Sequence, residues 1–172
     1  TRVVNYVSNT FHEDPGKDAT RIGDILMWND YSGLWYNMGD PGFSKDEMPP
    51  FLDLAGQELP DKPLVISEYG LCEPAFDGGD PRRIELMRYH TLQYNQRSFI
   101  GGNIYFSLND YRTHMGEAGE HRFRQRVHGL TDLQGRKKPS YDVLAGLYTP
   151  VRELSGSYMG EDFHVTGRNY DG

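Results

Sequence analysis

The chain has 172 residues, a length typical of a single domain, and it carries 25 acidic against 18 basic side chains, for a formal net charge of −7. This acidity argues against a nucleic acid as the main partner, since phosphate binding needs a basic surface, and no apolar stretch reaches the ~20 residues of a membrane-spanning helix. The single cysteine, Cys72, excludes an intrachain disulfide and a cysteine-rich zinc module.

Short apolar runs rich in β-branched and aromatic residues predict strands. They lie at residues 3–7, 25–28, 64–66 and 104–108. Most of these runs are almost continuously apolar, which is typical of strands covered on both faces, as in a parallel sheet.

Helix signals lie after these runs. A short helix is predicted from Pro50 to Gly56, because Pro50 suits the first turn of a helix and interrupts an earlier start. Asp80 followed by a proline predicts the N-cap of a second helix that continues to about Phe99. Ser140 is predicted to cap a last helix, which ends before a proline.

This alternation of strands and helices predicts an α/β fold with a parallel sheet. A complete (β/α)₈ barrel needs roughly 250 residues, so the chain is either a small open α/β domain or half of a barrel. The segment 155–172 is rich in Gly, Ser and Tyr and is predicted to be a linker towards a following domain.

Polar residues follow each predicted strand, at the end where parallel α/β folds build their sites. They are Ser8-Asn9, Asn29-Asp30, Ser67-Glu68 and Asn109-Asp110. Glu68 stands out, because glutamate is a poor turn residue and costs much to bury without a partner. A carboxylate in this position suggests a nucleophile or a general base.

Several segments resemble the family-two glycoside hydrolases, the β-galactosidase and β-glucuronidase group. The segment 62–70 (KPLVISEYG) is similar to the nucleophile segment of that family, and 24–36 is similar to its sixth strand and the following loop. The segment 102–113 is similar to its eighth strand, and 129–139 to the stretch before its last helix. The order and spacing of these matches extend the resemblance over residues 2–154.

The resemblance implies that residues 1–154 form the second half, strands five to eight, of a (β/α)₈ TIM barrel. It implies a retaining exo-β-glycosidase, nearest to the β-galactosidases, that hydrolyses terminal β-linked sugars through a glycosyl-enzyme on Glu68. It also implies substrate-binding roles for Asn29, Tyr31, Trp35, Phe106 and Asp110, with Tyr31 as a donor to Glu68. No cofactor is implied, and the family suggests a secreted or periplasmic location.

The chain also departs from the family pattern. The family's acid/base is the glutamate of an Asn-Glu pair that ends the fourth strand, and this chain contains no Asn-Glu pair. We therefore expect the acid/base residue to lie in the remaining half of the barrel. That half, together with N-terminal β-sandwich domains, would be the partner of this chain. We expect the chain alone to be inactive. Arg126, Val127 and His128 occupy the place of an Asn-x-Lys that marks glucuronide-specific members, which makes a β-glucuronidase-type enzyme the less favoured alternative.

Two further alternatives belong to other classes. A groove lined by Trp and Tyr without a working carboxylate pair would make a non-catalytic carbohydrate-binding or remnant domain, and an unrelated open α/β domain is a third hypothesis. Residues of metal-binding type occur at His12, Glu13 and Asp14 and again at His114, Glu117, His121 and His128. Because no regular structure is predicted to aim them, we expect no metal site.

Overall fold

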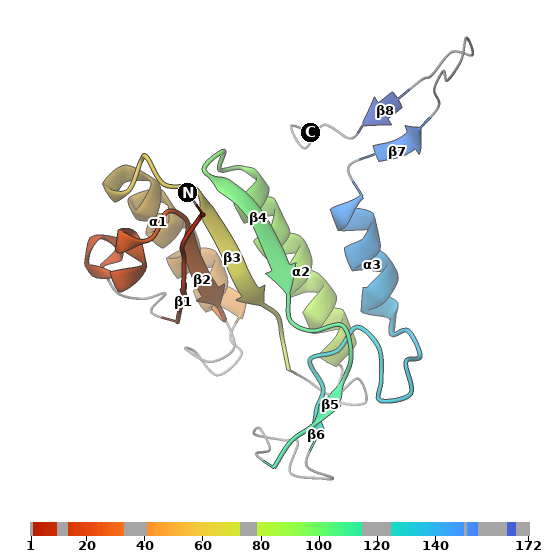
Figure 1. The fold of residues 1–172 in the computed structure, drawn as a ribbon. Helices are drawn as coiled ribbons and strands as arrows, with labels where there is room; N and C mark the ends of the chain where they lie inside the picture. Colours follow the sequence, from red (N-terminus) through yellow and green to blue (C-terminus); the bar gives the residue numbers. More distant parts are fainter. Residues whose placement is uncertain are drawn as a thin grey trace.

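A four-stranded parallel sheet forms the centre of the molecule. The computed structural model describes residues 2–9, 14–32, 41–72, 79–114, 125–149, 151–154 and 165–167. Figure 1 shows the strands in the order in which they follow along the chain. They are β1 (Val7–Ser8), β2 (Leu26–Asp30), β3 (Leu64–Tyr69) and β4 (Ile100–Tyr105). The predicted α/β class with a parallel sheet is therefore confirmed.

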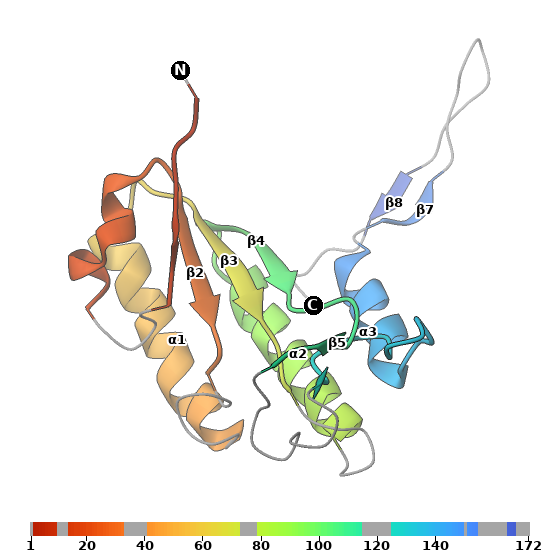
Figure 2. The ribbon, with the colours of Figure 1, turned by 60° about the horizontal axis from the view of Figure 1, so that its bottom comes forward.

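Two long helices cover the same face of this sheet. Helix α1 (Pro41–Glu58) connects β2 to β3, and α2 (Gly79–Asn95) connects β3 to β4. Figure 2 shows both of them behind the sheet. Such crossovers are how a chain returns to the starting end for the next parallel strand. The described residues include no helix with the length and hydrophobicity needed to cross a bilayer.

Shorter elements complete the fold. The 3₁₀ helices η1 (Pro15–Lys17) and η2 (Ala19–Ile22) lie between β1 and β2. Helix α3 (Pro139–Tyr148) packs against α2. Two small antiparallel sheets pair β5 (Tyr111–Arg112) with β6 (Gln125–Arg126), and β7 (Val151–Leu154) with β8 (Val165–Gly167). Strand β8 lies inside the range 155–172 that the sequence predicts to be a linker.

The hydrophobic core lies between the sheet and the helices. In β2 the side chains of Leu26 and Trp28 are buried, while Met27 between them is only half-buried. This alternation is the period of two expected for a strand with one covered face. The core contains Leu26, Trp28, Met48, Leu52, Ala55, Leu64, Ile66, Tyr69, Leu71, Leu86, Met87, Tyr94, Tyr105, Leu130 and Leu144.

The opposite face of the sheet is not covered by the described residues. Val7, Met27, Val65 and Gly102 are register partners across the four strands and form one row on this face. Val7 is 47% exposed, and Ile104 of β4 is 53% exposed. The prediction that the strands are covered on both faces is therefore wrong for the described part of the chain.

Helix α1 differs most from its prediction, because it starts at Pro41 and continues through Pro49 and Pro50. A proline inside a helix removes the N–H that would bond to the carbonyl four residues earlier. For Pro49 that carbonyl belongs to Lys45, and the Tyr89 hydroxyl of α2 donates to it at 3.1 Å. Tertiary contacts of this kind allow the helix to continue where the sequence predicted a start.

Strands β1 and β4 also differ in their bounds. Within the predicted strand 3–7 only Val7 is in β1, and β4 begins at Ile100 instead of 104. Strand β4 contains Gly101 and Gly102, residues with low strand propensity that hide it from a search for apolar runs. Pairing with β3 defines this strand, since Leu64 and Ile100 are register partners.

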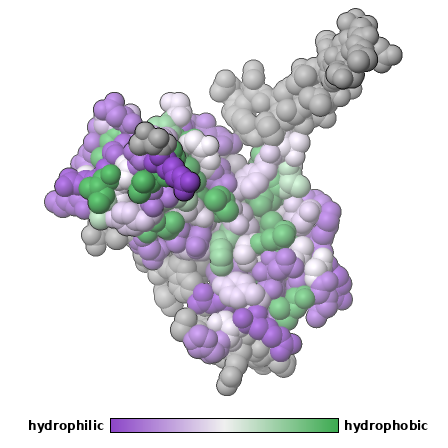
Figure 3. All heavy atoms as spheres, viewed as in Figure 1, coloured by the Kyte–Doolittle hydropathy of each residue, from purple (hydrophilic) through white to green (hydrophobic). Residues whose placement is uncertain are grey.

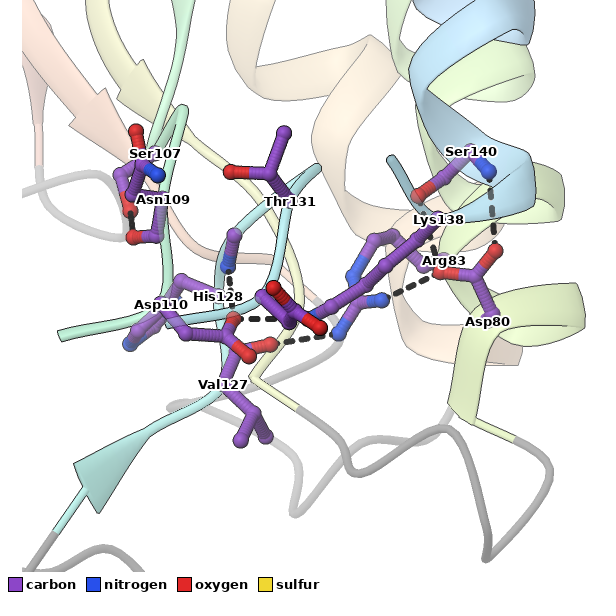
Figure 4. A network of polar contacts seen from close by, with 12 residues as sticks. Asp80, Arg83, Ser107, Asn109, Asp110, Val127, His128, Thr131, Lys138 and Ser140 are labelled. Atoms are coloured by element: carbon purple, nitrogen blue, oxygen red, sulfur yellow. Dashed lines mark hydrogen bonds and ion pairs between the residues drawn. The ribbon is translucent and has the colours of Figure 1, made fainter. Parts of the chain in front are cut away.

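The first turn of α3 is held by a carboxylate from α2 and not by the predicted Ser140 cap. Helix α3 begins at Pro139, and Ser140 donates its backbone N–H and its hydroxyl to Asp80, each at 2.8 Å (Figure 4). Asp80 is also paired with Arg83, whose side chain is fully buried. Arg83 further donates to the carbonyls of Leu71 and Val127.

We expect Asp80→Ala to lower the free energy of unfolding by about 3–5 kcal/mol, because it leaves the buried Arg83 charge and two donors of Ser140 without their acceptor. Chemical denaturation of the purified chain measures the change. Glu85→Ala is the matched control: Glu85 lies on the same helix in an exposed pair with Lys45, and such pairs contribute about 0–1 kcal/mol. Equal losses in the two variants would contradict the assigned role of Asp80.

Candidate active site

A β-bulge in β3 aims the Glu68 side chain. Trp28 pairs with Ile66 and the next residue, Asn29, pairs with Glu68, so that β3 has one extra residue, Ser67, at this point. Tyr69 points towards the helices, where its hydroxyl lies 3.2 Å from that of Thr91. Glu68, as its neighbour, therefore points to the uncovered face of the sheet. Bulges of this kind re-aim side chains next to active sites.

Tyr31 is hydrogen-bonded to Glu68, as the resemblance implied. Tyr31 directly follows β2, and its hydroxyl donates to Glu68 Oε2 at 2.7 Å. The Tyr31 side chain is buried and Glu68 is half-buried. A short bond from a buried phenol fixes the rotamer of the carboxylate and leaves its second oxygen, Oε1, available for chemistry. Within the described residues, Glu68 is the only glutamate on the parallel sheet.

Aromatic rings lie beside this pair. His128 is buried, and its ring centroid lies 6.4 Å from that of Tyr31 and 5.3 Å from that of Phe106. Tyr111 stacks on His128 with an interplanar angle of 9°. Phe106 is half-buried, and the peptide bond that follows it is cis. The sequence placed His128 among weak metal ligands and at the position of the family's Asn-x-Lys, but nothing in its local pattern shows that its ring packs against Tyr31, Phe106 and Tyr111.

Asp110 fixes the segment that carries His128. Its Oδ1 accepts from the Gly129 N–H at 2.9 Å and from Lys138 Nζ at 2.7 Å (Figure 4). Burial lowers the pKa of the Lys138 ammonium, and the hydrogen bond to Asp110 opposes that shift. Asp110 is itself only 7% exposed. The structure thus gives this side chain a positional task, and its predicted contact with substrate stays a prediction.

The remaining predicted site residues divide between described and undescribed parts of the chain. Asn29 is half-buried at the end of β2, and its Oδ1 accepts from the Ser67 hydroxyl at 2.8 Å. Trp35 lies outside the described residues, as do His12, Glu13, Glu117 and His121 from the possible metal ligands. In the described ranges no group of three or more His, Cys, Asp or Glu side chains could hold a metal ion.

These positions lie at the carboxyl end of the sheet or in the segments that follow it. Glu68, Tyr31 and Asn29 come from adjacent strands, and the ring of His128 and the carboxylate of Asp110 come from the segments after β4. A half-buried carboxylate with one oxygen held by a phenol hydroxyl can serve as a nucleophile towards an electrophilic carbon.

No protein-family model matches this sequence, and a search of curated proteins found no match. The fold, however, is similar to solved structures of glycoside hydrolases. A β-glucuronidase of Faecalibacterium prausnitzii is 24% identical with a TM-score of 0.69, and the match covers 85% of this chain and 25% of that one. A β-glucuronidase of Bifidobacterium dentium in complex with coumarin-3-O-glucuronide is 18% identical, with a TM-score of 0.69 and coverages of 84% and 23%.

A family-two β-galacturonidase of Eisenbergiella tayi, bound to galacturonate, is 17% identical with a TM-score of 0.64 and coverages of 83% and 26%. The chain thus spans about a quarter of the length of these proteins. At the level of the fold, the similarity confirms the resemblance to family-two glycoside hydrolases that the sequence motifs indicated.

We expect Gly129→Ala to destabilise the protein by about 1–3 kcal/mol or more. A Cβ at this position would overlap the backbone of Asp110, Asn109 and Thr131, which cannot move aside as a flexible side chain would. Gly146→Ala is the control, because a Cβ there meets no atom within 4 Å and alanine favours the α3 helix. Thermal unfolding of both variants measures the difference, and a similar melting temperature for the two would contradict the close packing around Gly129.

Proposed function

We propose that this chain is the second half, strands five to eight, of the (β/α)₈ catalytic barrel of a retaining β-glycosidase, with Glu68 as its nucleophile. The observation that carries this proposal is the 2.7 Å hydrogen bond from the Tyr31 hydroxyl to Glu68 at the carboxyl end of a parallel sheet. The similarity to glycoside hydrolases and the motif around Glu68 support the same conclusion.

The uncovered face of the sheet supports the half-barrel part of the proposal. In a barrel, residues of this face fill the interior, and closure leaves no strand edge unpaired. Here β1 and β4 are the outer strands, and the row that contains Val7, Met27 and Val65 is not buried by the described residues. The remaining half of the barrel is the proposed partner that would cover this row, with N-terminal β-sandwich domains preceding it.

The proposed reaction has two steps. In the first, Glu68 Oε1 attacks the anomeric carbon while the glycosidic bond breaks and a general acid protonates the leaving oxygen. In the second step, the residue that served as general acid now acts as a base. It takes a proton from a water molecule, which attacks the anomeric carbon and releases Glu68. That acid/base must lie within about 5–5.5 Å of the nucleophile. We place it in the other half of the barrel, so the chain alone is expected to be inactive.

We expect Glu68→Gln to lower kcat of the full-length enzyme by roughly 10³-fold or more, because the amide cannot form the glycosyl-enzyme. Hydrolysis of aryl β-galactosides and aryl β-glucuronides measures the loss. Glu85→Gln on the exposed side of α2 is the control and should hydrolyse the same substrates as the wild type does.

A 2-fluoro sugar should label the peptide that contains Glu68. Turnover by Glu68→Gln above about 1% of wild type, or a label elsewhere, would contradict the assignment. Sugar binding without any turnover by the wild type would favour a carbohydrate-binding domain.

Two classes of sugar are candidates for the substrate, a neutral β-galactoside and a β-linked uronide. The sequence pattern favours a β-galactoside, whereas the similar solved structures are β-glucuronidases and a β-galacturonidase. A uronide carries a carboxylate that needs a cation. Arg126 is suitably placed, since its Nη1 lies 3.4 Å from the hydroxyl of Tyr111, whose ring stacks on His128 beside the site.

If the substrate is a uronide, Arg126→Gln should raise KM for aryl β-glucuronides by about 10–100-fold, the loss of a charge-assisted hydrogen bond of about 1.5–3 kcal/mol. The matching aryl β-glucoside and β-galactoside should be affected little. Arg136→Gln serves as the control, because Arg136 is exposed and paired with Asp132. An equal effect of Arg126→Gln on neutral and acidic substrates would contradict recognition of a carboxylate.

A further inference from the structure

A buried carboxylate lies directly before Tyr31 in the chain. Asp30 is the last residue of β2, its exposed fraction is 0%, and it points towards the helices. Its Oδ1 accepts from the backbone N–H of Ser32 at 2.9 Å and from the Ser32 hydroxyl at 2.5 Å. Asp30 therefore holds both ends of the turn at whose centre Tyr31 lies.

Helix α2 holds the other oxygen of this carboxylate. The Tyr94 hydroxyl donates to Asp30 Oδ2 at 2.6 Å, and His90 Nδ1 lies 3.0 Å from the Tyr94 oxygen. Because Tyr94 has a single hydroxyl proton and gives it to Asp30, the Nδ1 of His90 must be the donor to Tyr94. Nδ1 also lies 3.6 Å from Asp30 Oδ2. His90 thus donates to Tyr94, and Tyr94 donates to the Asp30 carboxylate.

Burial stabilises the protonation states that this chain of donors requires. Burial lowers the pKa of His90, against the opposing effect of Asp30, so its ring is neutral at pH 7. Burial and the neighbouring Asp30 raise the pKa of Tyr94, so its hydroxyl keeps its proton. The ring of His90 stacks on Tyr69 with centroids 6.0 Å apart, which limits its rotation.

The last residue of β2 and the residue after it connect this network to the site on the opposite face. Asp30 faces α2, and Tyr31 faces the open side, where its hydroxyl meets Glu68. Hydrophobic side chains in the place of Asp30 and Tyr94 would pack there at lower cost than a buried carboxylate. The polar network instead fixes the backbone conformation of the turn after β2, and this conformation sets where the Tyr31 hydroxyl lies.

We propose that Tyr94 and His90 of α2 are positioning residues that hold Asp30 and thereby place the Tyr31 hydroxyl on Glu68. This inference rests on the proposed function, in which Glu68 must present its free oxygen to the anomeric carbon. A small shift of a group that orients a nucleophile lowers the rate much more than it changes substrate affinity. The network thus controls the chemical step from the side of the sheet that substrate does not reach.

The test uses Tyr94→Phe in the full-length protein, a change that removes one hydroxyl and keeps the ring in the core. We expect kcat to fall about tenfold or more while KM changes less than about twofold. Tyr148→Phe is the matched control, because it removes a hydroxyl from the same aromatic layer, 3.0 Å from that of Tyr69, and should leave kcat unchanged. Equal kcat values for the two variants would overturn the inference.

A double-mutant cycle tests whether Tyr94 acts through Tyr31. The double variant Tyr31→Phe/Tyr94→Phe should lose no more activity than Tyr31→Phe alone, since the hydroxyl that Tyr94 positions is already absent. Independent losses that multiply in the double variant would show that Tyr94 acts by another route and would overturn the inference.

A second measurement does not depend on turnover. In protein labelled with 3-fluorotyrosine at its 12 tyrosines, the ¹⁹F NMR signal of Tyr31 is assigned by its loss in Tyr31→Phe. This signal should move in Tyr94→Phe and stay in Tyr148→Phe. An unmoved signal in Tyr94→Phe overturns the inference whether or not the protein hydrolyses a glycoside. A moved signal in a protein without glycosidase activity would support the positioning network and contradict the proposed function.

Discussion

The structure at the carboxyl end of the sheet depends on hydrogen bonding to buried carboxylates. A buried carboxylate is tolerated only when donors satisfy it, so each one fixes the segments that supply those donors. Asp30 joins the turn after β2 to α2, Asp80 joins α2 to α3, and Asp110 joins the segment after β4 to the residues before α3. Together they define the positions of Tyr31 and His128 beside Glu68, without contributing exposed charge to the site.

The second constraint is the unequal covering of the sheet. Its helix side contains the core, whereas the other side, which faces the viewer in Figures 1 and 3, shows hydrophobic side chains among polar ones. Val7, Ile104 and Leu108 are among the exposed large apolar residues. Glu68 and Tyr31 meet on this same side. The candidate nucleophile therefore lies on the same surface that another part of a barrel would cover. A site of this kind would need a second half of the barrel to exclude water.

The sequence predicted the parallel α/β fold and the presence of helix α2 correctly, because apolar runs and an Asp-Pro pair near a helix start are local features. It placed Asp80 at the N-cap, whereas α2 begins at Gly79, ends at Asn95 and not near Phe99, and uses the Asp80 carboxylate to bind Ser140 and Arg83. Asn109 and Asp110 do not follow directly on the last strand, since β4 already ends at Tyr105. The sequence also missed the start of α1 and the cap of α3. In both cases a partner far along the chain supplies the hydrogen bond that local rules leave unmade: Tyr89 for the carbonyl opposite Pro49, and Asp80 for the first turn at Ser140.

The sequence by itself determined that Glu68 lies near the carboxyl end of a strand and that its flanking residues resemble a glycosidase nucleophile segment. Only the tertiary structure decided which way this carboxylate points. Simple alternation from Leu64 and Ile66 places Glu68 on the helix side of the sheet, whereas the extra residue in β3, Ser67, moves it to the open side. The bulge arises from pairing with β2 and β4, and pairing between strands is set by packing across the whole sheet. For the same physical reason, no local pattern shows that α2 holds Asp30, because residues 64 positions apart in the chain meet only when the layer is assembled.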